Sequence, residues 1–258
     1  MTVSPSVPPA ALLADASVPR ERAQALAERL HLPLATTPPP AGVLLRLTPA
    51  HVELSLPGDP EFPAPLLVDF DRVLRRARHA GSELLVRACK VRHTRRPLVI
   101  DATAGLGRDG FLLAAAGFRV RMIEAHPLIA TLLQDGLKRA AASPHLAMIA
   151  ERVELSCGNA LDLLPTLNEQ PDVIYLDPMF PERKKSAKVK QELRLLQKIV
   201  GNPVPPEQVL RRALELCPRK VVLKQPRYGA PLDLAPSYSL HGKAVRFDIF
   251  LGAEKKNA

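Results

Sequence analysis

The second half of the chain alternates short apolar segments with helix-like segments, and this alternation limits the possible folds more than any other feature. Apolar segments with the length of strands lie at residues 97–101, 118–124, 152–156, 171–177 and 219–225. Strands that alternate with helices in this way predict a parallel sheet with helices on both faces. Two further strands, at 237–242 and 244–252, are close enough to form a hairpin. The expected fold is therefore α/β, a doubly wound Rossmann-like sheet with a C-terminal antiparallel hairpin.

The N-terminal part of the chain has a different composition. Eight of the 27 prolines lie in the first forty residues. A helix is expected from Pro19, which suits a first-turn position, to Leu30. Short strands are expected at 43–49, 51–58 and 65–70. The sequence thus divides into a small α+β appendage at 1–70, a basic helical connection at 71–96 and the doubly wound domain at 97–258.

Positive charge is concentrated in two places. The chain carries 36 Lys and Arg against 26 Asp and Glu, a formal net charge of +10. Residues 71–96 hold nine Lys or Arg against two acids. The second basic cluster consists of Arg183, Lys184, Lys185, Lys188 and Lys190, with Arg194 beyond it. Such clusters attract a polyanion by counterion release; the alternative is a solvated helix face.

Other features exclude several classes of protein. No stretch approaches the roughly 20 apolar residues that a membrane helix needs, and the N-terminus lacks the pattern of a signal peptide. Cys89, Cys157 and Cys217 are scattered and form no CxxC pair, which excludes a disulfide framework and a thiolate zinc site. We therefore expect a cytoplasmic protein that needs neither a metal nor a membrane.

A glycine-rich turn follows the first strand of the alternating region. Gly105 to Gly110 match G-x-G-x-x-G, and Glu124 follows Gly105 by nineteen residues, near the spacing at which an acid binds a ribose. Asp101 closes the strand before the turn. A carboxylate there would repel a pyrophosphate but can face an ammonium group, and Asp109 in the first helical turn also disfavours a phosphate. The alternative is a tight turn that binds no ligand.

Asp101, Gly105, Gly107 and Glu124 together resemble the cofactor pattern of class I methyltransferases. The resemblance implies S-adenosylmethionine as the cofactor. It places Glu124 on the ribose hydroxyls and the glycine turn under the methionine part. NAD-linked oxidoreduction is the more distant alternative.

The fourth strand runs into Asp177-Pro178-Met179-Phe180-Pro181, at the end where doubly wound sheets bind ligands. This string resembles the [Asn/Asp/Ser]-Pro-Pro-[Tyr/Phe] motif of methyltransferases that act on exocyclic or amide nitrogens, with Met179 in place of the second proline. Asp177 can accept hydrogen bonds from the amine, Pro178 stiffens the turn and Phe180 can stack on a base. Methyl transfer then depends mainly on positioning and needs no metal or covalent nucleophile. The alternative is an ordinary turn.

The second basic cluster begins three residues after Phe180. This is where a nucleic-acid backbone would lie if its base turned into the site. Its placement favours nucleic acid over a free metabolite or a protein as the substrate.

Several longer strings resemble the bacterial small-subunit ribosomal RNA methyltransferase J family. They are DATAGLGRD (101–109), RVRMIE (119–124), YLDPMFP (175–181) with KKSAKVK after it, and RFDI (246–249). The resemblance covers most of the chain from about residue 45. It implies transfer of a methyl group from S-adenosylmethionine to guanine N2 in 16S RNA, in the hairpin loop near the 3′ end. Carried over position by position, the cofactor residues are Arg108, Asp109, Glu124, Ala125, Asn159, Ala160 and Asp177.

Three alternatives stay open from the sequence. The same motif would serve adenine N6 in nucleic acid or a protein glutamine, and an RNA-binding assembly factor with an inactive pocket is a third possibility. The acceptor is expected to be 16S RNA or the 30S subunit, and the sequence does not define an oligomeric state. His126, Lys224 and Arg246 can each either contact substrate or cofactor or serve only the fold.

Overall fold

The computed structural model describes residues 10–71, 73, 83–178, 187–200, 204–216, 218–229 and 232–252, without the side chains of 187–191 and 193. The chain forms two compact units. One comprises residues 1–68, 131–139 and 181–203, and the other comprises 69–130, 140–180 and 204–258. Within the described ranges, no helix is long and apolar enough to span a membrane.

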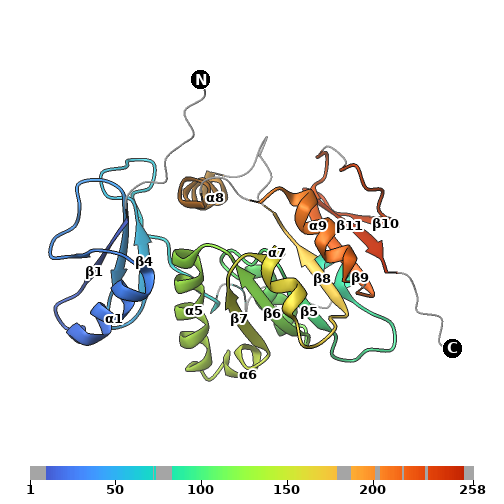
Figure 1. Cartoon of the computed structure of the whole chain (residues 1–258), viewed down its shortest axis with the longest axis horizontal. Coiled ribbons are helices and arrows are strands. Elements are labelled where there is room, and N and C mark those ends of the chain that lie inside the picture. The colour runs from blue at the N-terminus through green and yellow to red at the C-terminus, as the bar shows by residue number, and fades with distance from the viewer. Residues whose placement is uncertain are drawn as a thin grey trace. The chain divides into compact units, whose positions relative to one another are not determined.

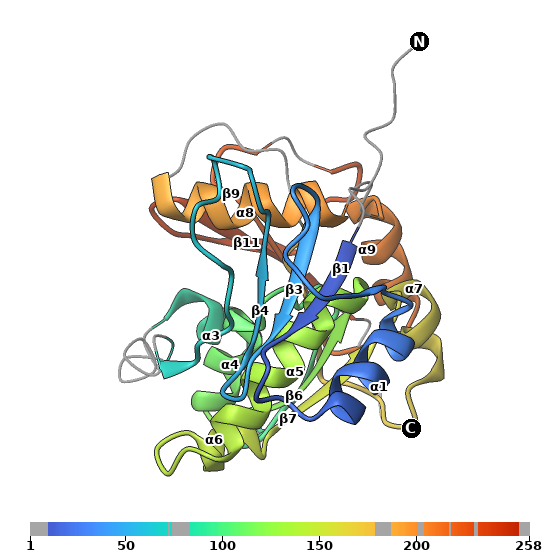
Figure 2. The ribbon, with the colours of Figure 1, turned by 90° about the vertical axis from the view of Figure 1, so that its left-hand side faces the viewer.

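The first unit contains a four-stranded sheet in the order β2-β1-β3-β4, and Figure 2 shows β1, β3 and β4 side by side. Its elements are β1 (Ala10–Ala14), α1 (Arg20–Leu30), β2 (Leu34–Ala35), β3 (Val43–Leu47) and β4 (Val52–Ser55). The helix and the strands predicted at 43–49 and 51–58 are confirmed. β1 pairs in parallel with both β2 and β3, and neither β1 nor β2 was expected.

The strand predicted at 65–70 is wrong. This segment forms only a single bridge, in which Leu66 pairs with Leu54 of β4. Leu66, Val68 and Phe70 are buried without a ladder, and Phe70 stacks on Phe111 with the ring centroids 4.0 Å apart. Burial alone therefore produced the strand-like pattern.

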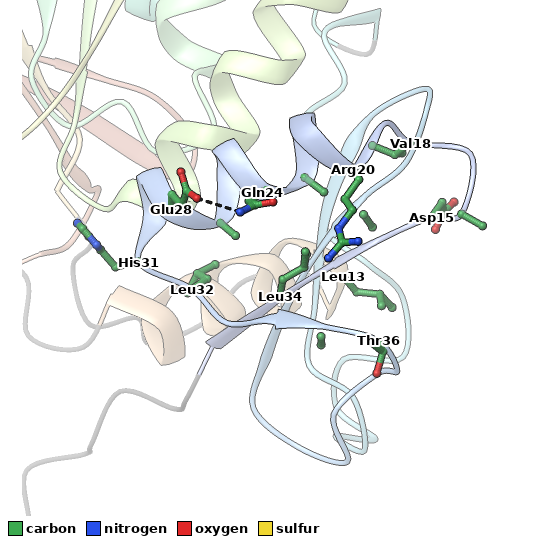
Figure 3. Close-up of a pocket in the computed structure, with 15 residues that line it drawn as sticks. Leu13, Asp15, Val18, Arg20, Gln24, Glu28, His31, Leu32, Leu34 and Thr36 are labelled. Atoms are coloured by element: carbon green, nitrogen blue, oxygen red, sulfur yellow. Dashed lines mark hydrogen bonds between the residues drawn. The ribbon is translucent and has the colours of Figure 1, made fainter.

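Helix α8 (Ala187–Val200) belongs to the first unit. Lys198 pairs with Asp59 at 2.6 Å, and Arg194 pairs with Glu61, so α8 is fixed to the loop after β4. A groove lined by α1, β1 and β2 lies elsewhere in this unit (Figure 3). None of the site residues predicted from the sequence lines it.

The second unit contains a seven-stranded sheet in the order β10-β11-β9-β8-β5-β6-β7. Its strands are β5 (Leu98–Asp101), β6 (Arg119–Glu124), β7 (Val153–Cys157), β8 (Val173–Leu176), β9 (Lys220–Pro226), β10 (Tyr238–His241) and β11 (Val245–Leu251). The five strands from β5 to β9 are parallel, and β11 runs antiparallel to both β9 and β10. The predicted doubly wound sheet and its terminal hairpin are confirmed.

Helices pack on both faces of this sheet. The helices of this unit are α3 (Leu84–Cys89), α4 (Arg108–Ala115), α6 (Ala147–Ala150), α7 (Ala160–Leu163), a 3₁₀ turn (Leu164–Thr166) and α9 (Pro206–Glu215). Residues 131–139 of α5 (Pro127–Ala141) are assigned to the first unit. On one face, α7 and α9 cover Ile100, Ile174 and Leu223, and Figure 1 shows these two helices on the same side of the sheet. On the opposite face, α4 packs on β6 and α3 packs on β9 and β11.

The three-part division of the sequence stays a prediction. Within the expected connection, the described residues include α3, while residues 72 and 74–82 lie outside the described ranges. The basic residues Arg72, Arg75, Arg76 and Arg78 fall in this gap.

Candidate active site at the carboxyl ends of the parallel strands

The turn between β5 and α4 needs glycine at two positions. Gly105 has φ +54° and Gly107 has φ +71°, a left-handed conformation that other residues rarely adopt. The amide of Gly107 donates to the carbonyl of Ala104 at 2.8 Å, and α4 begins at the next residue. A Cβ at Gly105 would meet no atom within 4 Å. The backbone of this turn is therefore open on that side to a ligand.

Glu124 ends β6 and fixes the glycine turn beside it. One carboxylate oxygen accepts from the amide of Gly105 at 2.8 Å and the other accepts from the amide of His126 at 2.8 Å. Burial raises the pKa of Glu124, and these backbone donors oppose the shift. Each carboxylate oxygen can accept a second hydrogen bond, so Glu124 can still bind the hydroxyls of a ribose.

Strand alternation gathers polar side chains on the face of the sheet that α4 covers. Ile100, Ile174 and Leu223 point to the face of α7 and α9, so Asp101, Tyr175 and Lys224 point to the opposite face. The strands β5, β8 and β9 are neighbours, with Tyr175 opposite Asp101 and Leu176 opposite Leu223. The order of the strands reverses between β8 and β5, which is the switch point where such sheets bind ligands.

Lys224 lies at the centre of this cluster. Its Nζ is 2.5 Å from Oδ2 of Asp109 in the first turn of α4, and 2.7 Å from Oδ2 of Asp177. The hydroxyl of Tyr175 donates to the same oxygen of Asp109 at 2.7 Å. The amide of Asp177 donates to Oγ1 of Thr103 at 2.6 Å. The side chain and the backbone of Asp177 are therefore both fixed by neighbouring strand ends.

The charges of this cluster shift the pKa values of its members. Burial lowers the pKa of Lys224, but the charges of Asp109 and Asp177 more than offset it, and the net shift is upward. Burial and then the charge of Asp109 raise the pKa of Tyr175, which keeps its phenol protonated as a donor. The carboxylate of Asp177 attracts cations, and its side chain is 37% exposed. A cationic ligand is therefore favoured beside Asp109 and Asp177.

Asp101 lies deeper than the other acids. Only 2% of it is exposed, and its carboxylate accepts from the amide of Thr103 at 3.3 Å. Burial, and then the nearby charge of Asp109, raise the pKa of Asp101 to about 8. A Cβ at Gly110 would come within 2.9 Å of Oδ2 of Asp101, so a glycine in α4 makes room for this carboxyl group. Contact between Asp101 and a cofactor ammonium stays a prediction.

The variant Asp101→Asn is expected to make stability less dependent on pH. The folded carboxyl titrates near pH 8 and the unfolded one near its ordinary 3.8. Between these values the folded state binds more protons than the unfolded state, so the stability of the wild type falls as pH rises. The free energy of unfolding of the wild type, relative to the variant, should decrease by about 1.4 kcal/mol per pH unit in this window. Urea unfolding at pH 5, 6.5 and 8 would test this, and a constant difference would contradict it.

The remaining predicted cofactor residues surround the ends of β6 and β7. Asn159 caps α7, because its Oδ1 accepts from the amide of Leu161 at 2.9 Å, and Ala160 is buried behind it. Gly158, just before this cap, donates its amide to the carbonyl of Glu124 at 2.9 Å. Ala125 and Arg108 are exposed. Their contact with a cofactor stays a prediction.

Part of the predicted site lies outside the described residues. Pro178 follows Asp177 and is described, but the chain is not described again until residue 187. The predicted residues in this gap are Met179, Phe180, Pro181, Arg183, Lys184 and Lys185. For Lys188 and Lys190, the backbone lies in α8 and the side chains are outside the description.

The structure assigns partners to residues whose roles the sequence left open. Lys224 pairs with Asp109 and Asp177 of the predicted site. Arg246 donates to Gln225 at 2.8 Å and pairs with Asp248 at 3.0 Å, so it serves the fold near the end of β9. His126 is partly buried, which lowers its pKa, and its Nδ1 has no hydrogen-bond partner among the described residues. Thr103 was missed, since its only sequence signal is its position two residues after the strand.

These residues fit S-adenosylmethionine. This cofactor carries a ribose, an ammonium group and a positively charged sulfonium. The carboxylate of Glu124 lies beside the open glycine turn, and the carboxylates of Asp109 and Asp177 lie at the neighbouring strand ends. Within the described residues, no group of three or more His, Cys, Asp or Glu could hold a metal ion.

Residues 25–252 match the protein family described as "Putative SAM-dependent methyltransferase". Two similar relatives carry the name ribosomal RNA small subunit methyltransferase J. The one from Thioalkalivibrio sulfidiphilus is 46% identical over 239 residues, covering 90% of this chain and 93% of the relative. The one from Pseudomonas paraeruginosa is 43% identical over 255 residues, covering 92% and 97%.

A solved structure has the same fold. The chain superposes on a SAM-dependent methyltransferase from Neisseria gonorrhoeae with a TM-score of 0.76 and 34% identity, covering 94% of this chain and 96% of the other.

Proposed function

Because this chain belongs to the ribosomal RNA small subunit methyltransferase J family of SAM-dependent methyltransferases, we propose that it methylates the exocyclic N2 of a guanosine in 16S ribosomal RNA. The target is a nucleotide of the hairpin loop near the 3′ end. The observation that carries the proposal is the placement of Asp177. It stands at the switch point of the sheet, fixed by Lys224 and Thr103, beside the open glycine turn.

The residues around Asp177 have proposed roles in binding the cofactor. Glu124 holds the ribose, while the turn at Gly105 and Gly107 lets the cofactor approach the backbone. Asp109 and Asp177 face its positive charge. Bound S-adenosylmethionine supplies a methyl group on a positively charged sulfur.

Asp177 acts on the acceptor side of the reaction. The lone pair of a guanine N2 amine is delocalised into the ring, so the amine is a weak nucleophile. A carboxylate that accepts a hydrogen bond from the N–H of this amine fixes the orientation of the amine. The same hydrogen bond favours the loss of the delocalisation during attack. Most of the rate enhancement comes from this positioning. Phe180 is proposed to stack on the guanine, and Pro178 to stiffen the turn between them.

The positive charge of the chain supports an RNA acceptor. The net charge of +10 and the cluster from Arg183 to Lys190 suit phosphates close to the Asp-Pro motif. The proposed acceptor is 16S RNA or the 30S subunit in the cytoplasm.

Methyl transfer with analysis of the product nucleosides tests the proposal. Wild-type protein is incubated with tritiated S-adenosylmethionine and 30S subunits from a strain that lacks this gene. We expect label in N2-methylguanosine. Label in N6-methyladenosine, or in a protein glutamine, would show that the protein is a methyltransferase that acts on a different acceptor. If cofactor binds but neither subunits nor naked 16S RNA accept label, the acceptor is wrong. If no cofactor binds at millimolar concentration, a non-catalytic RNA-binding role replaces the enzyme.

A further inference from the structure

Tyr228 is an aromatic side chain in an unusual position. It is 90% exposed, on the turn that follows β9. The guanidinium of Arg227 lies 5.5 Å from the centre of its ring. An aromatic ring exposed to solvent offers a face on which a planar ligand can stack. The proposed roles in methyl transfer do not involve this residue.

The turn that carries Tyr228 is held rigidly from several directions. Arg246 donates to the carbonyl of Gly229 at 2.9 Å, and the amide of Gly229 donates to Pro226 at 2.9 Å. The amide of Arg227 donates to Ala244 at 3.1 Å. Because the backbone is already ordered, a ligand that binds the ring costs little additional conformational entropy.

Arg246 is itself fixed in place. Its guanidinium also donates to Oε1 of Gln225 at 2.8 Å and pairs with Asp248 at 3.0 Å. Asp248 in turn accepts from the hydroxyl of Ser239 at 2.6 Å. This buried network extends from β10 through β11 to the end of β9. It supports the turn without using the ring of Tyr228.

The turn follows the carboxyl end of β9, and the proposed acceptor site lies at the carboxyl end of the neighbouring strand β8. β9 pairs with β8, and Leu223 lies opposite Leu176, one residue before Asp177. Tyr228 follows Lys224 of the site by four residues. Two exposed cations belong to this region. Arg227 donates from its guanidinium to the carbonyl of Gly242 at 2.9 Å, and Lys243 is the next residue after Gly242. A ring next to cations suits a ligand that carries both aromatic and anionic groups.

We propose that Tyr228 stacks on an unpaired nucleobase of the RNA next to the target guanosine, with Arg227 and Lys243 near its phosphates. This inference rests on the proposed function, since it names how the acceptor of that reaction is held. Stacking of this kind is tolerant of base identity, because every base has an aromatic face. Tyr228 therefore contributes affinity for the RNA and leaves the choice of nucleotide to the site at Asp177.

A fluorescence experiment tests stacking directly. The chain contains no tryptophan, so Tyr228→Trp introduces a single reporter at the proposed contact. The matched control is Tyr238→Trp on β10, where the native tyrosine is 41% exposed. Titration with a 16S RNA transcript should quench the emission of Tyr228→Trp and leave that of Tyr238→Trp unchanged. Equal quenching at both positions, or none at position 228, would overturn the proposal.

Steady-state kinetics give a second readout. For Tyr228→Ala we expect KM for the RNA to rise about tenfold, with kcat and cofactor affinity unchanged, while Tyr228→Phe stays within about twofold of the wild type. Tyr238→Ala is the matched control. If the wild type methylates RNA and Tyr228→Ala has an unchanged KM, stacking is wrong and the proposed function stands. If the wild type methylates no RNA, the proposed function is wrong, and the stacking proposal that rests on it is overturned with it.

Discussion

Replacing Asp177 with alanine is expected to lower the rate of methyl transfer about 100- to 1000-fold. The carboxylate lies at the end of β8, held by the ammonium of Lys224 at 2.7 Å and, through its own amide, by Thr103 at 2.6 Å. Both contacts place it in one orientation before any acceptor arrives. Without it, the amine of the acceptor loses the group that aligns it with the methyl donor. Single-turnover methyl transfer to 30S subunits would measure the loss.

Two comparisons separate this role from others. Asp177→Asn keeps an oxygen that can accept from the amine but loses the charge that Lys224 pairs with, so its loss should be smaller than that of the alanine variant. Asp162→Ala removes an exposed acid on α7 and should leave the rate unchanged. Affinity for S-adenosylmethionine, measured by calorimetry, should change far less than the rate. A rate within tenfold of the wild type for Asp177→Ala would show that another group orients the acceptor.

The sheet could be predicted from the sequence because its signals are local. β5 and β8 are short, mostly apolar runs between helical segments, and burial on both faces preserves that pattern. The glycine turn and Glu124 were also local signals. Their hydrogen bond, from the amide of Gly105 to the carboxylate, follows from the parallel pairing of β5 with β6.

The interior of the site could not be predicted, because it depends on strand order. Tyr175 and Lys224 follow Asp109 by 66 and 115 positions, and they meet it only because β8 lies between β5 and β9. Strand alternation does place Tyr175 and Lys224 on one face. That inference needs the register, in which Leu176 is opposite Leu223, and no local pattern encodes it.

The errors in the first unit have a related cause. β1 is a five-residue segment of alanine and leucine, which are weak strand formers, and it forms a strand because it lies between β2 and β3. The segment at 65–70 has the opposite character. It is apolar enough for a strand but finds one bridge only, at Leu66. In both cases tertiary pairing overrides local preference.

Replacing Lys224 with methionine is expected to lower methyl transfer about 10- to 100-fold at pH 7 and to make the remaining activity more sensitive to acid. Oδ2 of Asp109 and Oδ2 of Asp177 both lie within 2.7 Å of the same ammonium nitrogen. With that charge removed, the two carboxylates repel each other, and one of them takes up a proton at a higher pH than in the wild type. Asp101 and Tyr175 face the same cluster, but burial keeps both mainly protonated at neutral pH and neither can replace the missing charge.

The pH profile of kcat/KM separates this electrostatic role from a packing role. If Lys224 positions Asp177 through its charge, the activity of Lys224→Met should fall between pH 8.5 and pH 6 at least about threefold more steeply than that of the wild type. Lys224→Arg keeps the charge and should keep the wild-type profile, although its larger head group lowers the rate. Lys220→Met is the matched control, since Lys220 lies on the same strand and donates to the carbonyl of Ala88 away from the site. A loss in Lys224→Met that is equal at every pH would mean that Lys224 only fills space, and that its charge does not orient Asp177.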